Sequence, residues 1–462
     1  MSRGGREEET PRTAPPTTAF PRGPDIRAPP WPEGRPQAPV DQRCPALVHA
    51  RRTVVAGKSA PALDRSFWKV FFASATANCA DGIGKISLPL FAASVTSNPV
   101  LISGLTAFAF LPWLLFGLPG GALVDRLDRR RAMSTVNIMR TVLLGALVLF
   151  IVAGAGNILM LYVAAFALGL CQVVYDSAAR AILPQVVGRR SLDKANSWLT
   201  VEETVGASFV GPPAGAALFG WYRAVPFICG AIGFALTALL VLAVPGRFRA
   251  ERTEPTTLRA DIREGVRWLW RHPVLRGLTI LSGLIAGFLS MATSLTILYA
   301  LNTLHVSPSL YGVLFIAMGA GGLVGSAVVG PLTSRFGRPR MITIAATIAP
   351  VMCVLLGTVT NLWAAGGWFF GIAVGVTMWN VLSMSLRQAM IPAELLGRVL
   401  GAHRVALWGG IPLGALIGGA LADRTSVPAA FFVSGLAQLV VVVMIYRLIS
   451  RHRQLIVDSF ES

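Results

Sequence analysis

Residues 121–131 read GALVDRLDRRR and join two long apolar stretches, so this segment is the best starting point for assigning a fold. Residues 330–340 read GPLTSRFGRPR, begin 209 positions later and again join two apolar stretches. A second landmark has nearly the same period, because Arg180 recurs as Arg387 after 207 positions. Two landmarks that share one period indicate an internal duplication, and the sequence therefore predicts two related halves.

The composition places both halves in a membrane. Hydrophobic residues make up 54% of the chain and charged residues 14%, whereas a soluble domain carries roughly 25% charged residues. A helix needs about 20 apolar residues to cross the hydrocarbon core. The predicted class is an all-α membrane protein with twelve transmembrane helices in two pseudo-symmetric six-helix halves. The predicted spans are residues 67–95, 101–123, 133–154, 157–178, 197–219, 222–245, 278–301, 309–332, 341–360, 362–385, 399–421 and 427–449.

The polar segments divide the chain further. Residues 65–245 and 277–450 form the two predicted halves, and residues 451–462 form a short cytoplasmic tail. Residues 1–64 are rich in Pro and Arg and lack helical periodicity, so we expect a disordered cytoplasmic tail. This tail contains no apolar core of the length that a secretory signal needs.

The connector between the halves, residues 246–276, carries eight arginines and four acidic residues. Within it, residues 258–270 predict an amphipathic helix on the cytoplasmic membrane surface. We expect this helix to act as a tether rather than as a regulatory or ligand-binding domain.

The basic residues predict the orientation, because Lys and Arg concentrate in cytoplasmic loops. The net charge is +19, but the charge is scattered through short loops, which favours topology over nucleic-acid binding. We expect a multi-pass protein of the bacterial inner membrane with both termini in the cytoplasm. The opposite loops contain only Arg223 and Arg424. The predicted cytoplasmic loops contain Arg126, Arg129, Arg130, Arg131, Arg180, Arg189, Arg190, Lys194, Arg335, Arg338, Arg340, Arg387 and Arg398.

The first loop resembles the signature of the major facilitator superfamily, which reads roughly G-x-x-x-D-R-x-G-R-R-x. Two positions depart from it, since Asp128 occupies the usual Gly position and Ser334 stands in the second copy where the first has Asp125. Asp128 with the arginines after it is similar to the branch that contains enterobactin-type and macrolide-type exporters. The matching residues are Gly121, Asp125, Arg126, Arg130 and Arg131.

The resemblance implies a gating role for these loops. A glycine lets two helices approach closely, an aspartate caps a helix N-terminus, and arginines pair with carboxylates on the facing half. The alternative is that the arginines only orient the helices. The candidate gating residues are Gly121, Asp125, Arg126, Arg130, Arg131, Arg335 and Arg338.

The fifth predicted span contains GASFVGPPAG at residues 206–215. The segment resembles the glycine and proline motif of proton-coupled drug antiporters and points toward export. Small residues at this spacing let two helices pack tightly, and a proline pair introduces a bend. The motif residues are Gly206, Gly211, Pro212 and Gly215.

Charged residues at membrane depth are costly and need a reason. Asp81 and Lys85 stand four positions apart on one face of the first span. They either pair with each other against a neighbouring helix or line a cavity, where Asp81 is a candidate proton carrier. Glu202 and Glu203 begin the fifth span and are either proton relays or interfacial residues.

Asp176 and Arg180 repeat the four-residue spacing at the cytoplasmic end of the fourth span, which predicts a gate or a helix-end pair. Arg140 in the third span is expected to reach the cytoplasm with its long side chain and is given no role. Three tryptophans within spans either line a cavity for amphiphiles or serve packing. They are Trp113, Trp368 and Trp379.

We therefore expect a secondary transporter that works by alternating access and exports a small amphiphilic molecule in exchange for protons. The substrate class is a drug, a siderophore or another metabolite. The alternatives are proton-coupled import and a transport-inactive receptor or scaffold. We expect a monomer that is not an enzyme and holds no cofactor, no metal and no disulfide, because the five cysteines lack ligand spacing.

Overall fold

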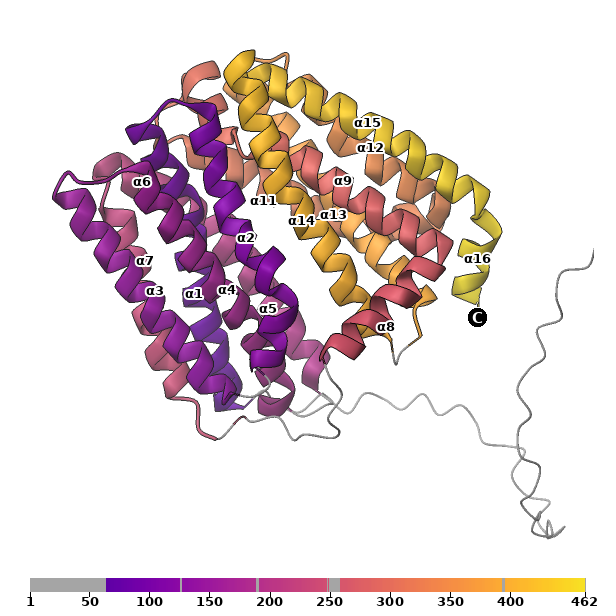
Figure 1. The fold of residues 1–462 in the computed structure, drawn as a ribbon, viewed down its shortest axis with the longest axis horizontal. Helices are drawn as coiled ribbons and strands as arrows, with labels where there is room; N and C mark the ends of the chain where they lie inside the picture. Colours follow the sequence, from indigo (N-terminus) through magenta and orange to yellow (C-terminus); the bar gives the residue numbers. More distant parts are fainter. Residues whose placement is uncertain are drawn as a thin grey trace, which may run out of the picture. The chain divides into compact units, whose positions relative to one another are not determined.

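The computed structural model describes residues 64–124, 127–187, 191–246, 248, 258–392 and 395–461. The predicted tail 1–64 lies outside this part of the chain, apart from Asp64. The Asp64 carboxylate accepts a hydrogen bond from the Arg65 backbone N–H and begins the first helix. The elements described are all helical (Figure 1).

The first half consists of helices that lie close to the predicted spans. They are α1 (Arg65–Val95), α2 (Pro99–Val124), α3 (Arg129–Val152), α4 (Ile158–Val186), α5 (Leu192–Thr204), the π-helix η2 (Val205–Val210), α6 (Gly211–Trp221) and α7 (Val225–Leu242). Elements α5, η2 and α6 follow one another without a break and form one rod.

The second half repeats this plan after the linker helix α8 (Leu258–Arg271), which confirms the helix predicted at 258–270. The following elements are α9 (Pro273–Thr293), α10 (Thr296–Leu298), the π-helix η3 (Tyr299–Thr303), α11 (Tyr311–Phe336), α12 (Arg338–Leu356), α13 (Leu362–Met390), α14 (Leu396–Arg424) and α15 (Val427–Arg451). The predicted C-terminal tail contains a short helix, α16 (Arg453–Glu461).

Within the described residues, ten helices are long and apolar enough to span a membrane. The other two predicted spans correspond to α1 and to the rod α5–η2–α6, which pack in the same bundle. Helix α1 contains Asp81 and Lys85, and the rod contains Glu202 and Glu203 and is divided into elements of 13, 6 and 11 residues. The twelve predicted spans therefore each have a helical counterpart.

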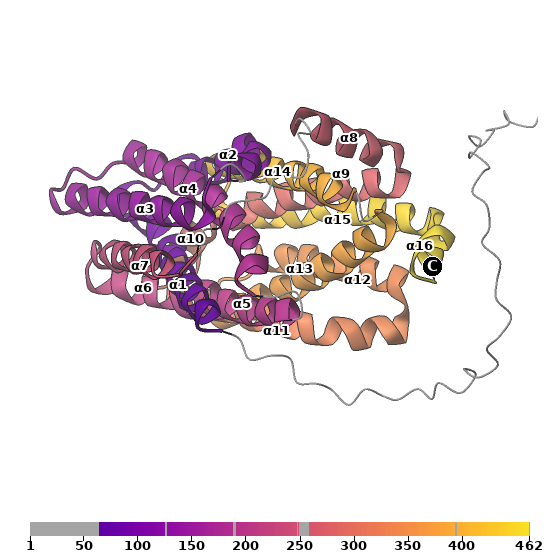
Figure 2. The same cartoon turned by 90° about the horizontal axis from the view of Figure 1, so that it is seen from below.

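The helices pack first within each half and then across a seam. In the first half α2 packs on α4 and α3 on α7, and in the second half α9 packs on α14, α11 on α13 and α12 on α15. The seam between the halves is formed by α2 against α14 and by α6 against α11. Figures 1 and 2 show the two halves side by side in two views.

The seam is tightest at the end of the bundle where α2 begins and α14 ends, which we call the sealed end. A Cβ atom added to Gly419 would lie 2.0 Å from the Ser103 hydroxyl oxygen and 2.9 Å from the Pro99 carbonyl oxygen. A Cβ on Gly312 would lie 2.6 Å from the Pro213 Cα atom. No side chain fits at these glycines without a shift of the backbone.

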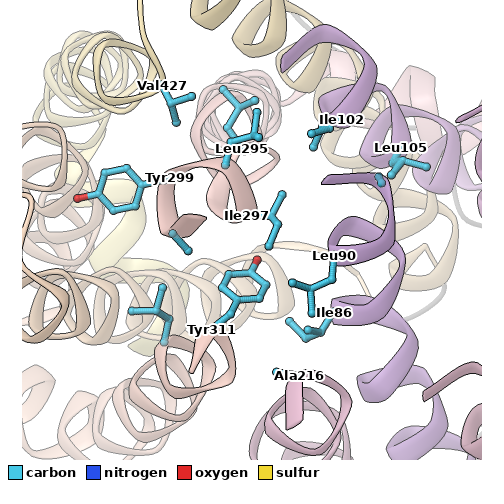
Figure 3. Close-up of a cluster of buried hydrophobic side chains, with 14 of the residues drawn as sticks. Ile86, Leu90, Ile102, Leu105, Ala216, Leu295, Ile297, Tyr299, Tyr311 and Val427 are labelled. Atoms are coloured by element: carbon cyan, nitrogen blue, oxygen red, sulfur yellow. The ribbon is translucent and has the colours of Figure 1, made fainter. Parts of the chain in front are cut away.

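A hydrophobic cluster from both halves fills the bundle behind this end (Figure 3). Its members are almost completely buried, so the seam excludes water here. The first half contributes Ile86, Leu90, Ile102, Leu105 and Ala216, and the second half contributes Leu295, Ile297, Tyr299, Tyr311 and Val427.

The opposite end, which we call the arginine-rich end, holds the loops predicted to be cytoplasmic. Arg223 and Arg424 lie at the sealed end, as the alternation of twelve crossings requires. At the arginine-rich end the linker helix α8 packs on the first turns of α14, where Leu269 is buried with Val399. Figure 2 shows α8 beside the ends of α9 and α14.

His272 lies at the arginine-rich end between α8 and α9. Its Nδ1 atom accepts a hydrogen bond of 3.4 Å from the Leu275 backbone N–H and so caps α9. The ring stacks on Trp268, with centroids 5.6 Å apart. Burial lowers the pKa of His272 from its ordinary 6.5, and nearby His452 lowers it further, against a smaller upward effect of the backbone. Only the neutral ring can accept this capping hydrogen bond, because protonation of Nδ1 removes the acceptor.

We expect the α8–α9 junction to loosen in acid. Since the folded pKa of His272 is depressed, its contribution to stability is present above about pH 6.5 and is lost as the pH falls through the folded value. Hydrogen exchange of the α8 amides, corrected for the intrinsic rate, should be faster at about pH 5 than at neutral pH. His272→Gln should remove this difference. Equal acid sensitivity in the variant and the wild type would contradict the assignment.

Candidate functional site

The site begins with one face of α1. Ser74, Asn78, Asp81 and Lys85 recur at helical spacing and form a polar stripe on an otherwise apolar helix. Beside this stripe α1 is packed by small residues, since a Cβ on Gly82 would lie 2.9 Å from the Gly206 carbonyl oxygen. Ser74, Asn78 and Asp81 are partly buried, whereas Lys85 at the end of the stripe is exposed.

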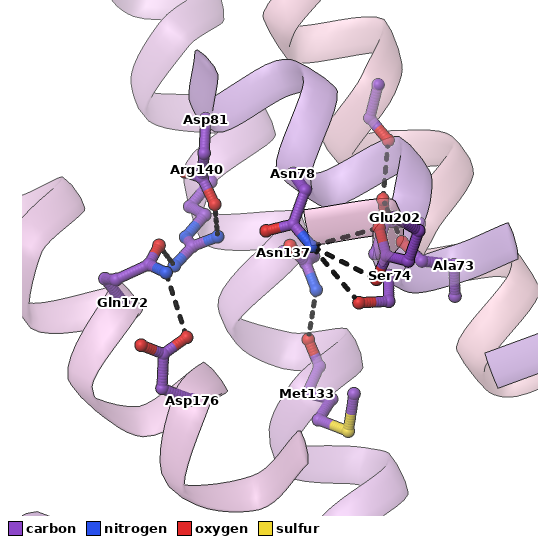
Figure 4. A network of polar contacts seen from close by, with 12 residues as sticks. Ala73, Ser74, Asn78, Asp81, Met133, Asn137, Arg140, Gln172, Asp176 and Glu202 are labelled. Carbon is purple, nitrogen blue, oxygen red and sulfur yellow. Dashed lines mark hydrogen bonds and ion pairs between the residues drawn. The ribbon is translucent and has the colours of Figure 1, made fainter. Parts of the chain in front are cut away.

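A chain of polar contacts leads away from this stripe (Figure 4). The Asp81 carboxylate lies 3.6 Å from a guanidinium nitrogen of Arg140 on α3. Arg140 donates a hydrogen bond of 2.5 Å to the Gln172 side-chain oxygen on α4. Gln172 in turn donates one of 2.9 Å to the Asp176 carboxylate. Three helices of the first half are thus connected by one network, which we call the Asp81–Asp176 chain.

Arg140 is the central member of this chain. Its side chain is only 1% exposed, and its guanidinium lies over the rings of Tyr175 and Phe234, 5.2 and 4.9 Å from their centroids. The expectation that Arg140 reaches the cytoplasm is wrong, because the side chain turns inward to the carboxylate of Asp81. Asp81 also does not pair with Lys85, because its carboxylate forms the ion pair with Arg140.

A second acidic group lies close to the same stripe. Glu202 is 7% exposed, and the Asn78 side-chain nitrogen donates to both of its carboxylate oxygens at 3.2 Å. Glu203 is exposed. The structure therefore separates the two glutamates and brings only Glu202 toward α1.

A pocket opens between the halves on the far side of the Asp81–Asp176 chain. It encloses about 490 Å³, a volume that includes open solvent, and both Asp176 and Arg180 lie on its wall. Asp176 bonds to Gln172 rather than to Arg180. The described residues lining it are Trp113, Gly117, Asp176, Ser177 and Arg180 of the first half and Gly401, Arg404, Val405 and Trp408 of the second.

Two tryptophans form the apolar part of this pocket. The rings of Trp113 and Trp408 meet edge to face across the seam, with centroids 4.1 Å apart. Trp368 has a half-buried ring against the hydrophobic cluster of the seam, and Trp379 is 7% exposed within the packed core of the second half. Of the three predicted cavity tryptophans, only Trp113 lies on the pocket wall. Lys85 is exposed and does not line it.

The glycine and proline motif produces an irregular helix beside α1. Pro212 and Pro213 have no N–H groups, so the helix cannot continue its regular hydrogen bonds, and the Gly211 N–H bonds to the Gly206 carbonyl across a π-turn. A Cβ on Gly215 would lie 2.8 Å from the Ile83 carbonyl oxygen. The motif glycines thus hold the rod α5–η2–α6 close to the polar stripe.

The arginines of the predicted gating loops bind within their own halves. Arg129 and Arg130 donate to the carbonyl oxygens of Ala181 and Val244, at 2.7 and 2.9 Å. A cation near the last carbonyl groups of a helix is stabilised by the helix dipole, which explains why these arginines bond to carbonyl oxygens near the ends of α4 and α7. In this conformation Arg130 thus bonds to a backbone carbonyl of its own half, and its pairing with a carboxylate of the facing half stays a prediction.

The remaining gating residues are also placed by local contacts. Asp128 caps α3, since its carboxylate accepts from the Arg131 N–H at 3.0 Å. In the second copy the Arg338 guanidinium lies 3.6 Å from the Phe460 ring centroid, and Arg335 is exposed. Gly121 lies in α2. The predicted gating residues Asp125 and Arg126 lie outside the described residues.

The two halves differ in their acidic residues. Between residues 277 and 450 the sequence contains only Glu394 and Asp423, and Asp423 lies in the last turn of α14. Buried Arg387 accordingly has hydroxyl partners, Ser383 at 3.3 Å and Ser282 at 3.1 Å. Acidic side chains deep in the bundle therefore belong to the first half.

Comparison with known proteins identifies the family. Residues 70–402 and 279–461 match the Major Facilitator Superfamily. The chain belongs to this superfamily. It is a multi-pass membrane protein and a secondary transporter of small molecules, and members of this superfamily are transporters and not enzymes.

Curated relatives narrow the comparison. The chain is 29% identical over 387 residues to the multidrug efflux pump Tap of Mycolicibacterium fortuitum, covering 80% of this chain and 92% of the relative. It is 21% identical over 391 residues to macrolide efflux protein A of Streptococcus pyogenes, again covering 80% and 92%. The predicted relation to macrolide-type exporters is thus confirmed, at 21–29% identity.

Solved structures confirm the fold. A mutant of the nucleoside transporter NupG superimposes with a TM-score of 0.69 at 10% identity, covering 83% of this chain and 99% of that one. A bacterial homologue of the iron transporter ferroportin in its inward-facing state superimposes with a TM-score of 0.68 at 16% identity, covering 84% and 99%. At these identities the likeness concerns the fold alone.

Proposed function

We propose that this transporter exports a small amphiphilic, drug-like molecule in exchange for protons across the bacterial inner membrane. The observation that carries the proposal is the Asp81–Asp176 chain, which connects a carboxylate inside the first half with the wall of the pocket between the halves. The multidrug and macrolide efflux relatives support the substrate class and the direction.

The chemistry of the network favours coupling between protonation of Asp81 and binding of substrate at Asp176. A proton on Asp81 removes its negative charge and weakens its attraction to Arg140. Arg140 donates to Gln172, and Gln172 donates to Asp176, so a shift of Arg140 that follows the charge of Asp81 also shifts these two side chains. A substrate in the pocket meets Asp176 directly and acts on the same network from the other side.

The arrangement of the seam supports alternating access. The sealed end is closed by glycine contacts and by the hydrophobic cluster, whereas the pocket lies beyond it toward the arginine-rich end. With the arginine-rich end in the cytoplasm, this conformation receives substrate from inside the cell. Export then requires the sealed end to open and the arginine-rich end to close.

Inside-out membrane vesicles test the proposal. After a proton gradient is generated, a macrolide and a lipophilic dye should accumulate in vesicles that contain the wild type, and nigericin should abolish the accumulation. Asp81→Asn should reduce gradient-dependent accumulation to background, because its amide cannot carry the proton. Asp458→Asn makes the same chemical change on exposed α16 and should have no effect.

The other outcomes each count against the proposal. Gradient-driven loss of substrate from the vesicles would identify an importer. Accumulation by Asp81→Asn equal to that of the wild type would remove Asp81 from the proton route. Absence of transport with correctly folded protein would favour a receptor or scaffold.

A further inference from the structure

The outward face of the linker helix α8 is basic. Arg263, Arg267 and Arg271 recur every four residues and are all exposed. Trp270, beside them, is 53% exposed. Successive i, i+4 positions share one side of a helix, so the three guanidinium groups form a continuous strip, which we call the α8 arginine face.

Packing on α14 fixes the direction of this face. Leu269 is 5% exposed, and it lies two positions from Arg267, which is about 200° around the helix. A Cβ on Gly265 would lie 2.7 Å from the Arg398 backbone, so the helices are in close contact. Glu264 forms an ion pair with Arg398 and does not neutralise the strip. The arginines therefore point away from the protein because the apolar side is occupied.

The position of α8 places this face at the membrane surface. Helix α8 ends at Arg271, and the hydrophobic span that follows begins at Pro273. A helix that ends two residues before a span lies at the interface between hydrocarbon and water, where tryptophan is favoured. The last turn of α8, with Trp270 and Arg271, thus lies at the level of the lipid headgroups.

Further basic residues lie at the neighbouring helix ends. The end of α15 is next to the start of α9, since a Cβ on Gly277 would lie 2.7 Å from a methyl carbon of Leu448. The exposed arginines around these two junctions are Arg276, Arg447, Arg451 and Arg453.

We propose that the α8 arginine face binds the headgroups of anionic phospholipids. Guanidinium groups match phosphates in charge and in hydrogen-bond geometry. The binding has a consequence for transport. Helix α8 packs on the first turns of α14, and the following turns of α14 contain Arg404 and Trp408 of the pocket. Lipid on α8 stabilises the position of that pocket wall. The lipid site itself does not depend on the proposed proton coupling.

Native mass spectrometry of protein released from phosphatidylcholine nanodiscs containing a minor fraction of phosphatidylglycerol tests this site. The wild type should retain phosphatidylglycerol in preference to phosphatidylcholine. Arg263→Gln with Arg267→Gln should weaken this preference by on the order of 30-fold, since each arginine near an anionic surface contributes about fivefold. Arg223→Gln with Arg424→Gln removes the same charge from the sealed end and should retain the lipid as the wild type does.

Two results would overturn the site. Equal retention by the α8 variant and the wild type would mean that the arginines only orient the helix during insertion. Equal loss in both double variants would mean that total charge, and not this face, attracts the lipid. Both readouts are independent of transport, so failure of the efflux proposal leaves them interpretable.

Discussion

Arg140→Gln is expected to abolish proton-driven transport and to destabilise the protein at the same time. The substitution leaves the Asp81 carboxylate inside the first half without its cation. Because the Asp81 side chain is 30% exposed, this loss should cost less than the roughly 3 kcal/mol of a fully buried ion pair. It also removes the link from Asp81 through Arg140 to Gln172, so transport should fall to background in the vesicle assay.

A double variant separates these two effects. Asp81→Asn together with Arg140→Gln removes both charges, so thermal stability should recover most of what Arg140→Gln loses. Transport should stay at background, because neither the proton carrier nor its cation is present. Recovery of transport together with stability would show that the pair is structural and would remove it from the coupling mechanism.

A disulfide across the sealed end is expected to stop transport completely. The Gly419 Cβ position lies 2.0 Å from the Ser103 hydroxyl oxygen, so cysteines at both positions approach disulfide distance after a small shift. Oxidation of Ser103→Cys with Gly419→Cys should lock this end shut and hold the protein in one conformation. Reduction should restore transport to the level before oxidation.

A crosslink within one half is the matched control. The Gly233 Cβ position lies 3.0 Å from the Ala80 Cβ atom, and both residues belong to the first half. Ala80→Cys with Gly233→Cys should therefore crosslink without loss of transport, because α1 and α7 move together. Both pairs are introduced after replacement of the five native cysteines. Full transport with the sealed end crosslinked would rule out alternating access through this end.

Much of the fold follows from the sequence because its determinants are local. Apolar length and arginine alternation predict the spans within a few residues, and the pattern of residues 258–270 predicts α8. The glycines of residues 206–215 mark the rod that packs on α1. Each of these signals lies within one segment of the chain.

The network and the pocket depend on contacts between distant segments, and here prediction from sequence stops. Helical spacing predicts a pair of Asp81 with Lys85, whereas in the folded protein the Asp81 carboxylate forms an ion pair with Arg140, 59 positions away. Arg404 and Trp408 were also missed, although Arg404 is a charged residue inside the predicted span 399–421. Assigning a role to every charge within a span would select both Arg140 and Arg404.

The most direct test of proton-coupled export is whether a substrate gradient alone drives protons the opposite way. Purified protein is reconstituted into liposomes that contain a pH-sensitive dye, with equal pH on both sides and substrate added only outside. Antiport predicts that substrate moving in drives protons out, so the lumen becomes alkaline, and that Asp81→Asn removes this change. Acidification of the lumen, or substrate flux without any change in pH, would contradict the account.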